Sequence, residues 1–356
     1  MVRRVRLGRR DDGRRRLTWA GPPPLLLLAT VLGLVVAPAV ADDRPAAKPA
    51  AVSPAGSART GAAATPRTIE PRIMRQVALP LSRGGQAGGT VAPVLPAIEV
   101  VGVASLNLLQ TQPISAATAD ALRLTGRSDV DVVGWQEAQK AGLALHDLPG
   151  WTTATFPEKG GFAELAVSWR TKKFKFVDAR IQDAIAGVGA GLGRYPFGSR
   201  QIAVVTLEHR ASGRRLTVLD AHLPPVIEDL TRPGRWTATQ NAEQARSQLR
   251  DLARAWRSVD TRWVVGTGDF NFGARADLKR RTAGGPVRTL GRVARSTYQV
   301  VGTGQRPTYP SLKRSIDYVW LDRDDLRTDE IDVLGHRVLT GYHSDHRPLL
   351  AELRLS

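Results

Sequence analysis

From about Ile98 onward, short apolar runs of strand length alternate with polar or glycine-containing breaks. The runs predicted to be strands are Ile98–Leu109, Val130–Trp135, Ala163–Val177, Gln201–Leu207, Arg214–Leu219, Arg262–Val265, Ile316–Leu321 and Leu349–Leu355. The break Ala211-Ser212-Gly213 predicts a hairpin. Helical spacing is limited to Ala116–Leu124 and to Gln240–Trp256, whose apolar face is Ala245, Leu249, Leu252, Ala253 and Trp256. Many strands with few interspersed helices predict a layered α/β sandwich.

The first 95 residues have a different composition and predict no core. Eight arginines between Arg3 and Arg16, an apolar run Leu25–Val36 and the small residues Ala39-Val40-Ala41 predict an export signal over residues 1–41. The alternative is a membrane anchor, although Pro38 interrupts the apolar stretch. Residues 42–95 are rich in Ala, Pro and Gly and are expected to form a disordered linker. The folded domain is then 96–356, in a secreted or extracytoplasmic location.

Charge and cysteine content narrow the possible chemistry. The formal net charge of the chain is +18. More than half of this excess lies before residue 96, so the folded domain is moderately basic and favours a polyanionic substrate. The chain has no cysteine, which excludes disulfides, thiolate metal sites and a cysteine nucleophile.

Six polar segments stand at the ends of the predicted strands. They are Ser105-Leu106-Asn107, Trp135-Gln136-Glu137, Asp220-Ala221-His222-Leu223-Pro224, Gly268-Asp269-Phe270-Asn271, Ser315-Ile316-Asp317-Tyr318 and Ser344-Asp345-His346-Arg347-Pro348. Glu137, Asp269 and Asp317 adjoin apolar runs that should be buried. An ionised carboxylate beside a core is costly unless it is paired or binds a metal.

These residue types suit a site for a hard cation and a phosphate. Asn107, Glu137 and Asp345 offer the oxygen ligands that Mg²⁺ prefers, and histidines at strand ends can bind phosphate or transfer protons. Taken singly, each segment is more often a turn, a helix cap or surface decoration. Six such breaks in this order are difficult to explain by structural needs alone.

Together the six segments resemble those of the endonuclease/exonuclease/phosphatase superfamily, which includes pancreatic-type deoxyribonuclease and bacterial sphingomyelinase. The resemblance extends from about Val101 to Leu353, and the family's "GDFN" is present unchanged at Gly268 to Asn271. It implies a four-layer α/β sandwich, in which two mixed β-sheets pack face to face and are flanked by helices. It also implies hydrolysis of phosphate esters.

The resemblance also implies a role for each matching residue. Asp269 would deprotonate an in-line water held by Asn271. Glu137, with Asn107 and Asp345, would bind Mg²⁺ or Mn²⁺, with Ca²⁺ as an alternative. His346, oriented by Asp317, and His222 would donate to phosphate oxygens. One of the two, with His222 preferred over His346, would protonate the leaving group. In deoxyribonucleases of the family a glutamate pairs with the catalytic histidine. Glu164 is the candidate here, its alternative being an ordinary outward-facing strand residue.

Substrate contacts and substrate class are less constrained. Arg200 and Arg314 are candidate phosphate clamps because a guanidinium matches phosphate geometry. Arg232, Arg235 and Trp236, in the loop Pro224 to Trp236, suit backbone contact and base stacking, which favours a nuclease acting on nucleic acid. No protein partner is implied, and a monomer is expected. The alternatives are a sphingomyelinase-like phosphodiesterase or phosphatase for lipid head groups, and a non-catalytic binding protein on the same fold.

Overall fold

The computed structural model describes residues 99–158, 161–189 and 195–356. The predicted export segment 1–41 and linker 42–95 lie outside the described residues. Among the helices of the described part, none is long and apolar enough to cross a membrane.

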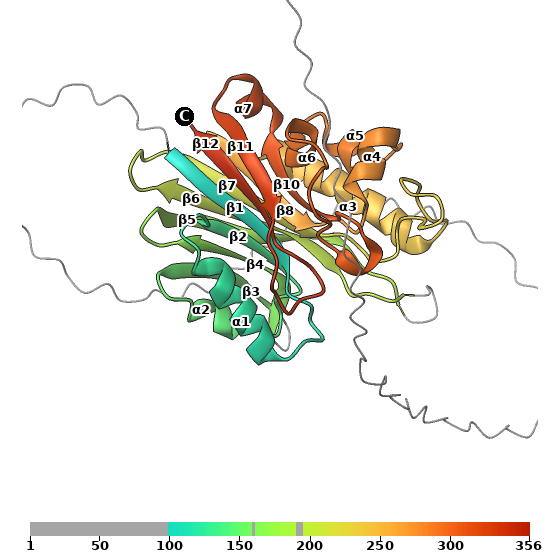
Figure 1. The fold of residues 1–356 in the computed structure, drawn as a ribbon, viewed down its shortest axis with the longest axis horizontal. Helices are drawn as coiled ribbons and strands as arrows, with labels where there is room; N and C mark the ends of the chain where they lie inside the picture. Colours follow the sequence, from blue (N-terminus) through green and yellow to red (C-terminus); the bar gives the residue numbers. More distant parts are fainter. Residues whose placement is uncertain (1–98, 159–160, 190–194) are drawn as a thin grey trace, which may run out of the picture. The chain divides into compact units, whose positions relative to one another are not determined.

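Twelve strands form two six-stranded sheets (Figure 1). The order in the first sheet is β11 (Ile331–Val338), β12 (Leu349–Leu355), β1 (Glu99–Asn107), β2 (Val132–Gln136), β4 (Gly161–Arg170) and β3 (Trp151–Glu158). The order in the second is β5 (Phe174–Ile185), β6 (Arg200–His209), β7 (Arg215–His222), β8 (Trp263–Asp269), β10 (Asp317–Asp322) and β9 (Ala294–Ser296). Each sheet has one parallel pair, β1/β2 or β7/β8, and its other pairs are antiparallel. Both sheets are therefore mixed.

The sheets pack face to face, and helices cover their outer faces. On β1, Val101 and Val103 belong to the core cluster that reaches the second sheet, whereas Ala104 and Leu106 face the helices. This alternation follows from the two-residue period of a strand. Helices α1 (Ile114–Thr125) and α2 (Gly142–His146) cover the first sheet, and α3 (Gln240–Arg257) with α5 (Pro286–Leu290) covers the second (Figure 1). The predicted four-layer sandwich is confirmed.

Shorter elements complete the helical side of the second sheet. They are α4 (Ala274–Arg280), α6 (Thr297–Val300), α7 (Arg323–Arg327) and a 3₁₀ turn (Pro310–Leu312). The hairpin predicted at Ala211-Ser212-Gly213 joins β6 to β7, with Gly213 at a φ of 70°. The single run Ala163–Val177 proves to be two strands in different sheets, β4 and β5.

Strand register brings the polar segments together. Asn107 pairs with Gln136 at the carboxyl ends of β1 and β2, and His222 pairs with Asp269 at those of β7 and β8. Asp317 begins β10 directly opposite Asp269. The two parallel pairs end at the same edge of the sandwich, since the Asn107 amide contacts Asp269 at 3.2 Å.

Candidate active site

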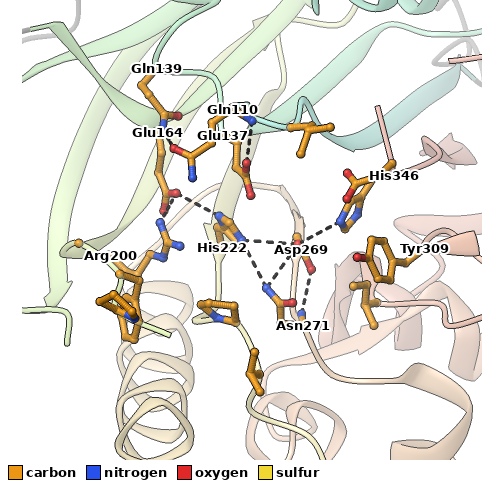
Figure 2. Close-up of a pocket in the computed structure, with 18 of the residues that line it drawn as sticks. Gln110, Glu137, Gln139, Glu164, Arg200, His222, Asp269, Asn271, Tyr309 and His346 are labelled. Atoms are coloured by element: carbon orange, nitrogen blue, oxygen red, sulfur yellow. Dashed lines mark hydrogen bonds and ion pairs between the residues drawn. The ribbon is translucent and has the colours of Figure 1, made fainter. Parts of the chain in front are cut away.

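A pocket of about 570 Å³ lies where these strand ends meet (Figure 2). Both sheets contribute to it, and its charged and polar lining residues include Glu137, Glu164, Arg200, His222, Asp269, Asn271, Arg314, Asp345 and His346. Eight of the eleven site residues predicted from sequence line it, and Asn107 and Asp317 stand directly behind it, bonded to Asp269 and His346 respectively.

Asp269 is the centre of the site, and both of its carboxylate oxygens receive donors. Oδ1 accepts a hydrogen bond from the backbone nitrogen of Asn271 at 2.9 Å. Oδ2 lies 3.5 Å from Nε2 of His222 and 3.7 Å from Nε2 of His346. The Asp269 side chain is almost fully buried. Two imidazoles from different segments therefore face one carboxylate at the floor of the pocket.

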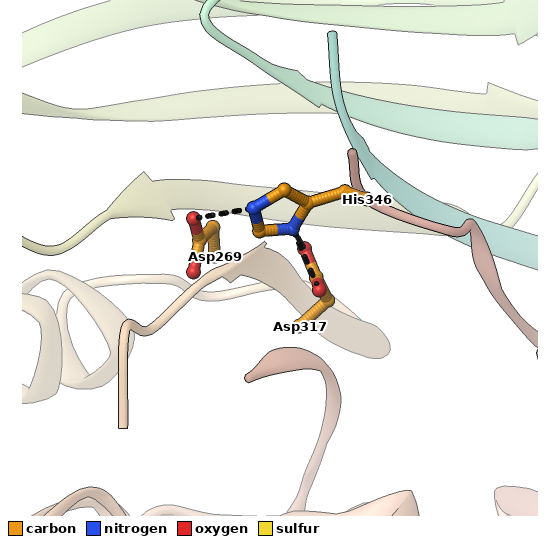
Figure 3. A group of neighbouring side chains, drawn as sticks. All are labelled: Asp269, Asp317 and His346. Carbon is orange, nitrogen blue, oxygen red and sulfur yellow. Dashed lines mark hydrogen bonds and ion pairs between the residues drawn. The ribbon is translucent and has the colours of Figure 1, made fainter. Parts of the chain in front are cut away.

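His346 lies between two carboxylates (Figure 3). Its Nδ1 donates to Asp317, with both carboxylate oxygens at 3.0 Å, and its Nε2 faces Asp269. Burial lowers the pKa of His346, but Asp317 and Asp269 more than offset this and raise the pKa to about 10. The trio is compact enough to hold a metal ion. However, Asp317 already accepts from the ring, so the arrangement is better explained as an imidazolium flanked by two anions.

His222 has a carboxylate partner of its own, Glu164. Glu164 Oε2 accepts a hydrogen bond from His222 Nδ1 at 3.0 Å and also pairs with Arg200. Burial and Arg200 lower the pKa of His222, but Glu164 and Asp269 raise it by more, and the net direction is upward. Glu164 is buried and points at His222, so it is not an outward-facing strand residue.

Glu137 and Asp345 form the acidic wall that suits a cation. Glu137 accepts from the amide of Asn107 at 3.1 Å and from the backbone nitrogen of Gln110 at 2.7 Å. Oδ1 of Asp345 is buried and has no hydrogen-bond partner among the described residues. Burial raises the pKa of Asp345, and repulsion from Glu137 and Asp269 raises it further. An orphaned buried carboxylate oxygen beside a second carboxylate fits a hard divalent cation.

Asn107 stands between the acidic wall and the Asp269 carboxylate. Its Nδ2 donates to both Glu137 and Asp269, while its Oδ1 accepts from the backbone nitrogen of Leu109 at 2.9 Å. In this orientation the amide nitrogen of Asn107 bridges the two carboxylates. Its oxygen is bonded to the backbone and is not offered to a cation.

Backbone strain is concentrated at the same place. Glu137 has a φ of 55° and Asn271 a φ of 48°, both in the left-handed region. Such conformations cost of order 1–3 kcal/mol and persist only where the surrounding structure enforces them. Here they turn the chain sharply after β2 and after β8, which directs both side chains into the pocket.

A buried polar network behind the pocket was not predicted from sequence. Oδ1 of Asp220 accepts from Nε2 of Gln136 and from Oγ1 of Thr267, each at 2.7 Å, and so joins the two sheets. Burial raises the pKa of Asp220 well above its usual range. A Cβ on Gly134 would stand 1.9 Å from Oγ1 of Thr267, so only glycine allows this contact. The network fixes β2 against β7 and β8, whose ends carry Glu137, His222 and Asp269.

Three further residues at or near the pocket were not predicted from the sequence. Asp120 on α1 is fully buried and accepts from the backbone nitrogens of His343 and Ser344, which holds the loop that carries Asp345 and His346. Glu228 pairs with Arg314 at the pocket wall. The ring of Tyr309 lies 4.9 Å from that of His346. A lone Asp, Glu or Tyr in a helix or loop gives no sequence signal of such a position.

The predicted substrate-binding residues differ in where they lie. Arg200 and Arg314 do line the pocket, but each is paired with a buried glutamate, Glu164 or Glu228. Trp236 is not among the described residues that line the pocket. Its ring packs against Phe272 at 4.6 Å and its Nε1 donates to the carbonyl of Ala283. The structure therefore does not bring the predicted stacking residue to the pocket.

A known protein family and several solved structures resemble this chain. The model of the endonuclease/exonuclease/phosphatase family matches residues 104–346. No curated protein matches the sequence. Among solved structures, an endonuclease/exonuclease/phosphatase from Bacteroides vulgatus is similar with a TM-score of 0.54 and 18% identity, covering 72% of this chain and 100% of that one. A humanized D. rerio TDP2 is similar with a TM-score of 0.53 and 15% identity, covering 71% and 98%.

The fold, with two histidine–carboxylate pairs converging on a buried aspartate, defines a class of enzymes that hydrolyse phosphate esters. The matched segment spans more than half of the chain and contains all of the site residues described above. The chain belongs to the endonuclease/exonuclease/phosphatase family and is a phosphoesterase.

Proposed function

We propose that the chain is an exported, divalent-metal-dependent phosphodiester hydrolase, and that it is a nuclease. The observation that carries the proposal is the position of Asp269, buried at the pocket floor with His222 and His346 both directed at it. A carboxylate in this position suits the activation of water, and the two imidazoles suit the phosphate that the water attacks.

In the proposed reaction, one P–O bond forms and another breaks in line. Asp269 takes the proton from the attacking water, which Asn271 helps to orient. His346, held as an imidazolium by Asp317, donates a hydrogen bond to a non-bridging phosphate oxygen. His222, held by Glu164, gives its Nε2 proton to the leaving oxygen. The products are an alcohol and a phosphate monoester.

Glu137 and Asp345 are the residues that would hold the divalent cation, with Asn107 beside them. When bound, Mg²⁺ or Mn²⁺ would offset the negative charge on phosphate and on the leaving oxygen. The buried, unpartnered Oδ1 of Asp345 supports this assignment. Without a cation, Glu137 and Asp345 would repel an anionic substrate.

The charge of the pocket favours a diester over a monoester. Its only lysine or arginine side chains among the described residues are Arg200 and Arg314, and a buried glutamate neutralises each of them. A dianionic phosphate monoester needs more compensating charge than a monoanionic phosphodiester. The geometry therefore supports a phosphodiesterase.

Two further observations support nucleic acid as the substrate, and a third supports export. The folded domain is basic, and a D. rerio TDP2 of similar fold, with a TM-score of 0.52 and 14% identity, was solved with a single-strand DNA product. The proposal of export rests on the arginine-rich and apolar N-terminal sequence alone.

A phosphodiesterase acting on lipid head groups is the second candidate. Val226, Leu230 and Leu312 line the pocket and are all exposed, at 42%, 54% and 47%. Exposed apolar residues at the mouth of a phosphoesterase pocket would suit a lipid surface.

A substrate panel separates these candidates. The full-length protein, with Mg²⁺ or Mn²⁺, is incubated with plasmid DNA, RNA and sphingomyelin, and the Asp269→Asn variant serves as the blank. We expect metal-dependent cleavage of a nucleic acid that EDTA abolishes. Cleavage of sphingomyelin alone would replace the nuclease proposal with the lipid one.

A further inference from the structure

The helices that cover the second sheet carry a large excess of positive charge. Residues 246–295 contain twelve Lys and Arg against four Asp and Glu. Three of the four acids, Asp251, Asp269 and Asp277, are buried. Asp251 pairs with Arg254 on α3, and only Asp260 is exposed near this surface.

Nearly all basic side chains on α3, α4 and α5 lack a carboxylate partner among the described residues. Arg254 is the one basic residue of these helices with such a partner within the described part of the chain, namely Asp251. Elsewhere on the domain several arginines and lysines pair with acids, as in Arg127–Asp129, Lys173–Asp131 and Arg354–Asp332. Positive charge on these helices is therefore little compensated by neighbouring carboxylates.

Four of the arginines form a stripe along α3. Arg246, Arg250, Arg254 and Arg257 follow one another at intervals of four, four and three residues, which places them on one face of the helix. At a rise of about 1.5 Å per residue the stripe is about 16 Å long. Like charges at this spacing repel one another. Within the described part of the chain only Arg254 of the stripe has a carboxylate partner, so most of this positive charge is not compensated locally.

The stripe is continuous with the pocket. Leu230 and Glu228 of the loop after β7 line the pocket. In the same loop, the carbonyl of Pro233 accepts from Nε of Arg280 at 2.6 Å, and the guanidinium of Arg246 lies 5.6 Å from the centre of the Trp236 ring. Trp236 therefore connects the loop to α3 instead of stacking on a substrate.

We propose that this strip, made of Arg232, Arg235, Arg280, Arg246, Arg250 and Arg257, binds the phosphodiester backbone of a nucleic acid whose scissile phosphate occupies the pocket. The proposal rests on the nuclease function proposed above. Because both pocket arginines are neutralised by glutamates, affinity for a long polyanion has to come from outside the pocket. The strip runs from the loop at the pocket mouth along α3. Arg232 pairs with Asp229, whereas Arg235, Arg246, Arg250, Arg257 and Arg280 have no carboxylate partner among the described residues.

The strip suits a nucleic acid better than an anionic membrane. A helix that docks on lipid presents large apolar side chains beside its basic ones. None of the exposed large apolar residues in the described part of the chain lies on α3, α4 or α5. The exposed apolar residues Val226 and Leu230 lie at the pocket mouth, on the loop after β7 and not on these helices.

The test compares Arg250→Gln/Arg257→Gln with the control Arg262→Gln/Arg327→Gln, whose arginines are exposed but paired with Glu330 and Asp324. Two substrates are used with Mg²⁺: bis(p-nitrophenyl) phosphate, a small diester, and a DNA strand of about 30 nucleotides. We expect the first variant to leave the small diester unaffected and to raise KM for DNA at least about fivefold. The slope of log KM against log salt should fall by about 1.5, since each phosphate contact contributes about 0.7–0.9. The control should match the parent.

Binding is measured separately, by fluorescence anisotropy of the same DNA on an Asp269→Asn background. An unchanged affinity and salt slope after the Arg250→Gln/Arg257→Gln change would contradict the proposed role of the strip in DNA binding. If DNA binding depends on the strip but the parent cleaves no DNA, the nuclease proposal is wrong and the DNA-binding role of the strip is retained. Strip-dependent binding to phosphatidylglycerol vesicles without DNA binding would overturn the nucleic-acid assignment.

Discussion

Glu164 and His222 belong to different sheets, yet Oε2 of Glu164 accepts a hydrogen bond from Nδ1 of His222 at 3.0 Å. The contact bridges β4 and β7 at the level of the pocket, and Glu164 is nine-tenths buried. It orients the ring so that Nε2 faces Asp269. The proposed general acid thus depends on the packing of one sheet on the other.

Glu164→Gln should therefore change the pH profile as well as the rate. Removing the negative charge removes a cause of the raised pKa of His222, so the pKa of His222 falls. Since His222 is proposed to act as an acid, activity should be lost at a lower pH than in the parent. General acid–base catalysis contributes about 10²–10⁴-fold, so we expect kcat to fall at least about tenfold.

The pH dependence of kcat on a soluble phosphodiester checks this, with Glu208→Gln as the control. Glu208 of β6 pairs with Lys175 of β5, near the end of β6 that is remote from Arg200 and the pocket. An alkaline limb that stays in place in Glu164→Gln would show that Glu164 does not act through His222.

Glu137→Gln should weaken metal binding. The change keeps the shape of the side chain but removes one of the two negative charges that face the proposed cation site. We expect the Kd for Mg²⁺ or Mn²⁺ to rise at least about tenfold, because substitutions around a metal site typically weaken metal affinity by about 10–100-fold. Calorimetric titration of the full-length protein with Mn²⁺ measures it. If Glu137→Gln binds as tightly as the parent, Glu137 is not the principal ligand.

Gly134→Ala should destabilise the domain. The added methyl group would stand 1.9 Å from Oγ1 of Thr267 and 2.7 Å from Oδ1 of Asp220, in the network between the sheets. Overpacking of this kind typically costs about 1–3 kcal/mol. Urea unfolding measures the free energy. Gly335→Ala on β11, where a Cβ meets nothing within 4 Å, is the matched control and should stay within about 0.5 kcal/mol of the parent.

Much of the site could be predicted from sequence because its residues directly follow apolar strands. Asn107, Glu137, His222 and Asp269 each end a buried run, and the ends of central strands in one sandwich converge. Two edge strands, β3 and β11, were missed for the converse reason. β3 contains threonines and Pro157, and β11 is interrupted by a bulge before Gly335, so neither shows the apolar run of a central strand.

What the sequence could not show is which charges neutralise one another. Arg200 and Arg314 have the residue type and the position of phosphate clamps, but each lies against a glutamate 36 or 86 positions away in the chain. Trp236, beside two arginines, has the composition of a stacking loop, but the apolar surface of Phe272 and the carbonyl of Ala283 engage it. Such pairings depend on tertiary packing, which no local pattern encodes.

The central claim is that Asp269 activates the water that attacks a phosphodiester, and Asp269→Asn tests it most directly. The asparagine keeps the shape and can still accept from the backbone nitrogen of Asn271, but it cannot take a proton. Single-turnover cleavage of DNA with Mg²⁺ is measured beside DNA affinity in the same variant. We predict that cleavage falls by at least about 10³-fold, while DNA binds as tightly or more tightly because a negative charge facing phosphate is gone. Cleavage within about tenfold of the parent, at unchanged affinity, would contradict the role assigned to Asp269.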